Sequence, residues 1–287
     1  MSEQDQVLLE HLVFLYGQEQ ARPVLERLTS ALDQFRVAYP EFSVPSPAGK
    51  ISEKDVILIT YGDMVSGEDE QPLETLGNFL KESLGEVVRA VHILPFYPFS
   101  SDDGFSVIDY RKVNSKFGDW EHIGKLNKDF RLMFDAVINH CSSQSPMFQG
   151  FLRGGPEFAE FFTVVEPGTD LTRVFRPRAT PVVTPFKTSE GEKLVWTTFS
   201  ADQVDLNFKN PDVLLEIVSI LLFYVAHGAE FIRFDAVTYV WKDLGTNCIN
   251  LPQTHRLVQL MRSIMEQVAP NVVIITETNV PHKDNVA

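Results

Sequence analysis

The sequence predicts an α/β fold in which the strands of a parallel sheet alternate with helices. Short apolar runs, of the kind that buried parallel strands contain, recur along the chain. They cover residues 56–60, 91–95, 132–138, 231–234 and 272–276. Helical apolar patterns lie between most of these runs, for example over residues 73–84 and 213–225. Strands that alternate with helices form βαβ units, and such units build a parallel sheet.

Residues 1–50 have a different pattern, which predicts an N-terminal helical extension. Two sets of apolar residues recur there at helical spacing. They are Leu8, Leu9, Leu12, Val13 and Leu15, and then Val24, Leu25, Leu28, Leu32 and Phe35. A proline-rich break over residues 39–50 follows them. We expect a helical hairpin that packs on the main domain and carries no chemistry.

The rest of the chain divides into three parts. Residues 51–140 contain the first three predicted strands, and residues 207–287 contain the fourth and fifth. Residues 141–206, which are rich in proline, are too many for an ordinary loop and predict an inserted subdomain, here named subdomain B. A (β/α)8 barrel needs eight strands. Since about five are visible, the chain is either the N-terminal part of a barrel or a different, open α/β sheet.

The composition argues against some classes of binding partner and indicates a cellular compartment. The formal net charge of −14 argues against nucleic acid and anionic membranes as partners. No stretch approaches the roughly 20 apolar residues of a membrane span, and the N-terminus shows no signal peptide. Cys141 and Cys248 have no metal-ligand spacing, and two reduced thiols fit the chain better than a disulfide does. We therefore expect a cytoplasmic protein.

Residues 231–237 place two charged side chains on an apolar strand. Arg233 and Asp235 are two residues apart, so they share one face near the carboxyl end of the strand. Such charges need a partner and hydrogen bonds. In a barrel, catalytic pairs of this kind lie at the carboxyl ends of the strands. A purely structural ion pair is the alternative interpretation.

A second carboxylate, Glu277, closes the last apolar run. Alone it is a weak signal, because many strands end in an acidic residue. Together with Asp235 it forms a carboxylate pair at nearby strand ends. Retaining glycosidases use such a pair about 5–5.5 Å apart, with one carboxylate as nucleophile and the other as general acid and then base.

Polar residues also end the third predicted strand. Asp135 and Asn139 share a face by the period of two, and His140 is expected to cap the strand. A lone histidine at a strand end is more often structural. This one follows two polar groups on an otherwise apolar strand, and a neutral imidazole could donate to a sugar hydroxyl.

These three segments, in this order, resemble the signature of the α-amylase superfamily. They read Asp135-x-x-x-Asn139-His140, Arg233-x-Asp235-Ala236-Val237 and a strand-terminal Glu277. The long insertion after the third strand is also similar to that superfamily. The resemblance implies a (β/α)8 barrel, incomplete here, with Asp235 as nucleophile, Glu277 as general acid/base and Arg233 orienting Asp235. It implies that Asn139 and His140 support and contact the glucosyl unit.

Further segments resemble the sucrose phosphorylase group of that superfamily. Residues 92–110 look like its loop after the second strand, where Asp103 would hold the glucose ring and Phe105 would lie against the same subsite. Residues 195–207 are also similar, and there Phe199 and Gln203 would line the acceptor side. Residues 175–178 match a loop with a phosphate-binding arginine, so Arg178 is the phosphate candidate. A solvated loop arginine is the alternative.

Residues 241–255 and 277–282 look most like the glucosylglycerate phosphorylase branch, which also carries a helical extension. The resemblance implies a double displacement in which a small-molecule glucoside and inorganic phosphate give α-glucose 1-phosphate. It implies no organic cofactor and a homodimer, and no acidic cluster predicts a metal site. The superfamily's third carboxylate would lie beyond residue 287, so we expect the chain alone to be inactive and poorly soluble.

Several alternatives stay open. Another phosphorylase of the group would act on sucrose, sucrose phosphate or glucosylglycerol, whereas an α-glucosidase or amylase would not need phosphate. An inactive sugar-binding fragment belongs to a different class. An NAD- or phosphate-binding open sheet is a remote alternative, because no glycine-rich loop follows the first strand.

Overall fold

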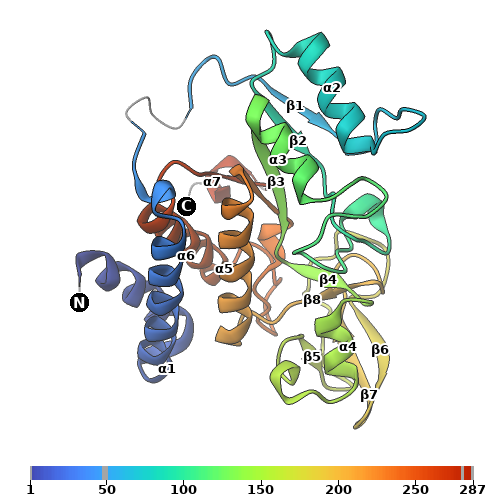
Figure 1. Ribbon diagram of the computed structural model, residues 1–287. Coiled ribbons are helices and arrows are strands. Elements are labelled where there is room, and N and C mark those ends of the chain that lie inside the picture. The colour runs from blue at the N-terminus through green and yellow to red at the C-terminus, as the bar shows by residue number, and fades with distance from the viewer. Residues whose placement is uncertain (1, 47–50, 279–280, 286–287) are drawn as a thin grey trace.

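A five-stranded parallel sheet forms the centre of the computed structural model, which describes residues 2–46, 51–278 and 281–285 (Figure 1). The strands lie in the order β1-β2-β3-β9-β10, and every neighbouring pair is parallel. They are β1 (Ile57–Thr60), β2 (Ala90–Ile93), β3 (Arg131–Val137), β9 (Ala229–Asp235) and β10 (Val273–Thr276). These strands occupy the predicted apolar runs, which confirms the predicted parallel α/β sheet.

The two faces of the sheet have different environments, because successive strand residues point to opposite sides. One face packs against the helices as part of the main hydrophobic core. The other carries a separate apolar layer of Ala90, Met133, Phe231 and Val273. In the strand register, Asp135 and Arg233 pair two residues beyond this layer, toward the carboxyl ends of the strands. This inner face is open at the edge strand β1, where Ile59 is 63% exposed.

Helices connect the strands where the sequence predicts them. They are α2 (Pro72–Leu84), α3 (Trp120–Asp129), α5 (Pro211–Ala226) and α6 (Pro252–Val268). The short α7 (His282–Asn285) follows β10. The side chains of Asp119 and Asn210 cap α3 and α5 by accepting backbone N–H groups of the first turn. Helix α5 is apolar around most of its circumference because it lies between the sheet and the N-terminal extension.

The N-terminal extension consists of α1 (Glu3–Ala38) and the 3-10 turn η1 (Pro40–Ser43). Gly17 interrupts α1 with φ 78° and ψ 170°, between the two predicted apolar sets. Glycine adopts this positive φ without the clash that a Cβ atom would cause. Helix α1 packs on α6 and α5 (Figure 1), and the ring of Tyr16 lies 6.4 Å from that of Trp241. The extension therefore reaches the segment that follows β9.

The insertion between β3 and β9 forms a small unit beside the sheet (Figure 1). Its elements are β4 (His140–Ser142), α4 (Pro146–Leu152), η3 (Pro156–Phe158), β5 (Val164–Val165), β6 (Val183–Thr188), β7 (Gly191–Trp196) and β8 (Gln203–Asp205). Strand β4 pairs antiparallel with β8, and β5, β7 and β6 form an antiparallel sheet. Because β4 follows β3 closely, the β4–β8 pair lies at the carboxyl ends of the parallel strands.

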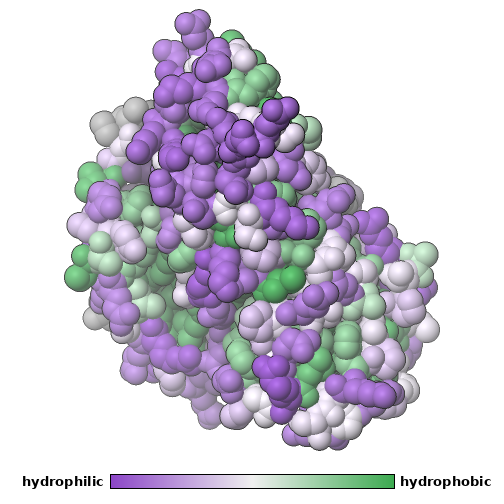
Figure 2. Space-filling model, turned by 45° about the vertical axis from the view of Figure 1, so that its right-hand side comes forward, coloured by the Kyte–Doolittle hydropathy of each residue, from purple (hydrophilic) through white to green (hydrophobic). Residues whose placement is uncertain are grey.

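Hydrophilic side chains cover much of the surface around α2, at the top of Figures 1 and 2. The segment that leads into α2 is rich in acidic residues, namely Asp63, Glu68, Asp69 and Glu70. None of the helices in the described part of the chain combines the length and the apolar character that a membrane span requires.

Candidate active site

A cavity of about 300 Å³ opens at the carboxyl ends of the parallel strands. Its walls are Tyr61, Asp102, Asp103, Phe105, His140, Arg178, Phe199, Gln203, Arg233, Asp235, Ala236 and Glu277. Every predicted catalytic and substrate-binding residue except Asn139 belongs to this wall, although the residues come from distant parts of the sequence. The cavity therefore gives the predicted residues one common location.

The guanidinium of Arg233 joins the two carboxylates of the predicted catalytic pair. Its Nη1 donates to Oδ1 of Asp235 at 3.1 Å, and its Nη2 lies 3.2 Å from Oε1 of Glu277. The same Nη1 donates to Oδ1 of the fully buried Asp135 at 2.5 Å. The other oxygen of Asp135 lies 2.7 Å from Nε2 of His92. Arg233 thus links the cavity to the buried Asp135–His92 contact between β3 and β2.

The backbone between β9 and β10 sets the position of Glu277. Thr276 pairs with Phe234, and the N–H of Glu277 continues this ladder to the carbonyl of Phe234 at 3.0 Å. Directly after Asp235, Ala236 turns the chain with φ 51° and ψ 26°, in the left-handed region. This turn directs the N–H of Ala236 to Oε2 of Glu277, to which it donates at 3.0 Å.

The buried carboxyl of Asp235 titrates far from its ordinary range. Burial first, and then the negative charge of Glu277, raises the pKa of Asp235 to about 8, although Arg233 acts in the opposite direction. The Asp235–Glu277 pair therefore holds one proton at neutral pH. Burial alone would lower the pKa of Arg233, but the surrounding carboxylates, Asp135 first, raise it on balance, so the guanidinium stays charged.

His140 lies in the wall of the cavity but does not cap β3, which corrects the sequence-based expectation. Strand β3 ends at Val137, and His140 begins β4. Its Nε2 lies 3.0 Å from the carbonyl oxygen of Phe105 and 3.2 Å from Nε2 of Gln203. Burial lowers the pKa of His140, which keeps the imidazole neutral near pH 7. Its ring packs against Phe199, with centroids 5.2 Å apart.

Asn139 lies behind the cavity rather than in its wall. Its Nδ2 lies 3.2 Å from Nδ1 of His140 and donates to Oδ2 of Asp205 at 2.9 Å. Its Oδ1 accepts from Nζ of the buried Lys242 at 2.8 Å, and the same ammonium lies 2.6 Å from Oδ2 of Asp205. Asn139 therefore supports His140 from a buried polar network. Within the described residues, no cluster of three or more histidine, cysteine or acidic side chains is arranged to hold a metal ion.

The loop after β2 brings Asp103 and Phe105 to the cavity through the 3-10 turn η2 (Asp102–Gly104). Asp102 and Asp103 both have positive φ, 55° and 47°. Nε2 of Gln203 donates to Oδ2 of Asp102 at 2.8 Å, so β8 holds this loop directly. The guanidinium of Arg233 lies 5.8 Å from the centre of the Phe105 ring.

Arg178 and Phe199 form the outer part of the wall. Arg178 is exposed, and no ion pair with it lies within 4 Å among the residues that the structure describes. The ring of Phe199 contacts His140 on one side and Tyr239, in the 3-10 turn η4 (Val237–Tyr239), on the other. Tyr61, Asp102 and Ala236 also line the cavity but are not among the site residues that the sequence predicts. Tyr61 follows β1 directly, and this strand-end position was the available signal.

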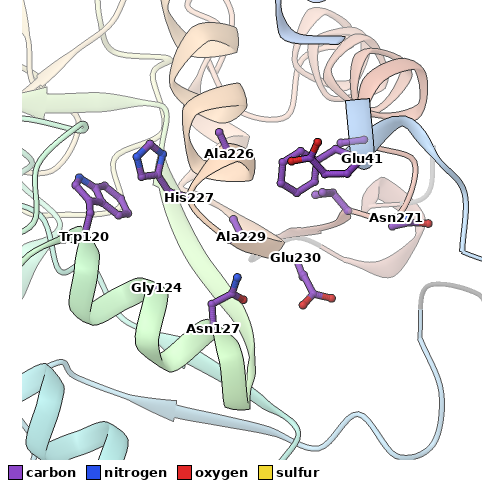
Figure 3. A pocket seen from close by; sticks show the side chains of 13 residues that line it. Glu41, Trp120, Gly124, Asn127, Ala226, His227, Ala229, Glu230 and Asn271 are labelled. Carbon is purple, nitrogen blue, oxygen red and sulfur yellow. The ribbon is translucent and has the colours of Figure 1, made fainter. Parts of the chain in front are cut away.

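Figure 3 shows a larger cavity, of about 470 Å³, near the amino ends of β9 and β10. Trp120 and Asn127 of α3, together with His227 and Glu230, lie along it (Figure 3). No residue of the predicted set lines this cavity. The described residues in its wall include no lysine or arginine, so the smaller cavity, with its Arg233-linked carboxylates, is the candidate active site.

The chain is similar to proteins of a known family. The alpha amylase catalytic domain family matches residues 78–287. The chain is 54% identical over 280 residues to the glucosylglycerate phosphorylase of Spirochaeta thermophila, covering 97% of this chain and 48% of the relative. It is 33% identical over 242 residues to the sucrose phosphorylase of Bifidobacterium adolescentis, covering 80% of this chain and 47% of the relative.

Among solved structures, the sucrose 6F-phosphate phosphorylase of Thermoanaerobacter thermosaccharolyticum resembles the chain with a TM-score of 0.72 and 30% identity. That match covers 80% of this chain and 49% of the other. The chain spans about half the length of the curated relatives it matches. Its parallel strands are accordingly part of a (β/α)8 barrel, which confirms the predicted incomplete barrel of the α-amylase type. The chain belongs to the α-amylase family, and glucosylglycerate and sucrose phosphorylases are among its relatives.

Proposed function

We propose that the protein is a retaining α-glucoside phosphorylase, which transfers a glucosyl group from glucosylglycerate or a related glucoside to inorganic phosphate. The observation that carries this proposal is the link of Asp235 and Glu277 through Arg233 in one cavity. A double displacement at an anomeric carbon uses one ionised carboxylate and one protonated carboxyl. The single proton of this pair supplies that combination.

In the first step, Asp235 attacks the anomeric carbon while Glu277 protonates the departing acceptor oxygen. The glycosidic bond breaks as the ester bond to Asp235 forms. In the second step, a phosphate oxygen attacks the same carbon, its proton passes to Glu277, and the ester bond breaks. α-Glucose 1-phosphate then leaves with retained configuration. Arg233 favours the ionised form of Asp235, and attack by Asp235 requires that the shared proton lie on Glu277.

The remaining wall residues divide into three subsites in this proposal. Asp103, Phe105 and His140 hold the glucosyl unit together with Arg233, because they surround the catalytic pair. Phe199 and Gln203 face the acceptor. Arg178 binds phosphate, and its exposed guanidinium without an ion-pair partner among the described residues supports this role. No cofactor takes part in these steps.

Glycerate is the proposed acceptor because a glucosylglycerate phosphorylase is a relative at 54% identity, against 33% for a sucrose phosphorylase. Sucrose is the second candidate donor, because the sucrose phosphorylase named above is a relative at lower identity. A cytoplasmic location and a homodimer also stay predictions, and size-exclusion chromatography tests the second of them.

The test is phosphate-dependent cleavage by the protein that the complete reading frame encodes. Purified protein is incubated with glucosylglycerate, sucrose or glucosylglycerol, with and without phosphate, and the anomeric configuration of the product is read by NMR. We expect α-glucose 1-phosphate from glucosylglycerate and none from the Asp235→Asn variant. Free glucose released equally without phosphate would instead identify a hydrolase. Turnover of a few per cent or more by a clean Asp235→Asn preparation would remove Asp235 as the nucleophile.

A further inference from the structure

The side chain of Asp202 lies directly before β8, outside the wall of the candidate active site. Four serine hydroxyls surround its carboxylate. Oδ2 accepts from Ser100 and Ser101, both at 2.5 Å, and from Ser106 at 2.8 Å. Oδ1 accepts from Ser143 at 2.6 Å. An ionised carboxylate only accepts hydrogen bonds, and four donors fill most of its capacity.

The serines around Asp202 belong to two segments that meet at the cavity. Ser100, Ser101 and Ser106 flank η2 and so enclose the turn that carries Asp103 and Phe105. Ser143 follows β4, and its N–H donates to the carbonyl oxygen of Asp202 at 2.8 Å. One carboxylate therefore ties the loop after β2 to the start of the insertion.

The loop after β2 has an unusual backbone that needs support. Asp102 and Asp103 both have left-handed φ values, which side chains with a Cβ adopt at a cost. Across the base of the loop, the N–H of Ser100 donates to the carbonyl of Ser106 at 3.1 Å, and the N–H of Ser106 donates to the carbonyl of Ser101 at 3.3 Å. Charge-assisted hydrogen bonds are roughly twice as strong as such neutral ones. Asp202, which accepts three such bonds from this loop, is therefore a strong anchor of the turn.

Asp202 is ionised, as the acceptor of several hydrogen bonds should be. Burial opposes ionisation, but the hydrogen bonds from the four serines outweigh it and lower the pKa of Asp202. The carboxylate is thus charged at neutral pH. The next residue, Gln203, holds the same turn through its bond to Asp102.

We propose that Asp202 is a positioning residue that fixes the loop after β2, so that Asp103 and Phe105 keep their places in the glucosyl subsite. The proposal rests on the proposed function for the identity of the ligand. Asp202 does not line the cavity, so it acts on binding through the loop.

The test compares Asp202→Asn with Asp55→Asn in the protein from the complete reading frame. Asp55 is a matched control: its carboxylate also accepts hydrogen bonds, from Ser52 and Arg131, but it lies at the amino end of β1. We expect Asp202→Asn to raise the KM for α-glucose 1-phosphate about tenfold, the loss of one charge-assisted bond, with little change in kcat. Asp55→Asn should lower Tm without a change in KM.

A double-mutant cycle with Asp103→Asn separates positioning from general stability. If Asp202 acts through Asp103, the double variant binds little worse than Asp103→Asn alone. Additive losses, or a lower Tm with unchanged KM for Asp202→Asn, would overturn the proposal. If Asp202→Asn does not fold, the Ser101→Ala and Ser106→Ala variants provide the same readout.

Hydrogen exchange distinguishes a failure of this proposal from a failure of the proposed function. The amides of Phe105 and Ser106 should exchange faster in Asp202→Asn than in the wild type, and at the wild-type rate in Asp55→Asn. This comparison needs no turnover, so it decides the role of Asp202 even if no phosphorylase activity is found. Equal exchange in Asp202→Asn and the wild type would overturn the anchoring role.

Discussion

The backbone N–H of Ala236 donates to Oε2 of Glu277 at 3.0 Å, across the gap between two neighbouring strands. Ala236 follows the proposed nucleophile Asp235 directly, so the chain that positions the nucleophile also holds the proposed acid. The bond depends on the left-handed φ of 51° at Ala236, where an L residue is strained.

Substitutions of Ala236 should separate this strain from the function of the turn. Ala236→Gly removes the Cβ and should stabilise the fold, by up to about 1 kcal/mol, with turnover retained. Ala236→Val should destabilise the fold and reduce turnover, because β-branched residues are outliers at positive φ. Urea unfolding measures the free energy of unfolding of both variants, and an activity assay measures their turnover. The same change in a helix, Ala31→Gly in α1, is the control and should cost about 1 kcal/mol. If Ala236→Gly destabilises the fold as much as Ala31→Gly does, Ala236 is not strained.

The raised pKa of Asp235 predicts a pH-dependent stability. The folded state binds the proton more tightly than the unfolded chain, whose aspartates titrate near pH 3.9. The stabilisation is therefore complete below about pH 4 and is lost as the pH rises toward about 8. Asp235→Asn, which cannot ionise, should gain Tm relative to the wild type between pH 5 and pH 8.5. Calorimetry at both pH values tests this, and a constant difference in Tm would refute it.

The buried ion pair of Lys242 and Asp205 should matter more for stability than any exposed pair. Burial lowers the pKa of Lys242, although Asp205 opposes the shift. Lys242→Met leaves the Asp205 carboxylate buried without its cation, which costs about 3–5 kcal/mol. Adding Asp205→Asn should recover part of this loss. Lys209→Met is the control, because the Lys209–Asp243 pair is about half exposed and should change stability by less than about 1 kcal/mol.

Arg178 should affect phosphate more than the glucosyl donor. Arg178→Ala is expected to raise the KM for phosphate roughly tenfold or more, since it removes a charge-assisted contact. The KM for the donor should stay near the wild-type value. Arg176→Ala, an exposed arginine two residues earlier in the same loop, is the matched control. A similar loss in both variants would mean that the general charge of the loop matters rather than a specific contact.

Much of the sheet and the wall could be predicted because their signals are local. An apolar run that ends in Arg233 and Asp235 carries both its strand and its charged face in a few residues. The role of Lys242 could not be read in this way. In sequence it is a lysine beside Asp243 in a loop, and its burial depends on Asn139 and Asp205, which lie far away in the chain.

Asp202 illustrates a second limit of local patterns. Its partners are ordinary serines, and only the folded chain brings Ser100, Ser101 and Ser106 to one carboxylate. The prediction that His140 caps β3 was wrong for a similar reason. The start of β4 depends on its pairing with β8, more than 60 residues later, and no local signal reports that pairing.

The contact of α1 with the barrel helices has a practical consequence for domain exchange. The apolar side chains of α1 belong to the same continuous core as those of α5 and α6, and Tyr16 lies against Trp241, the neighbour of Lys242. A chimaera that joins this barrel to a relative's N-terminal segment at residue 51 would build one hydrophobic core from side chains of two different proteins, which have not been selected to pack together. The extension and the barrel have to be transplanted as a single folding unit.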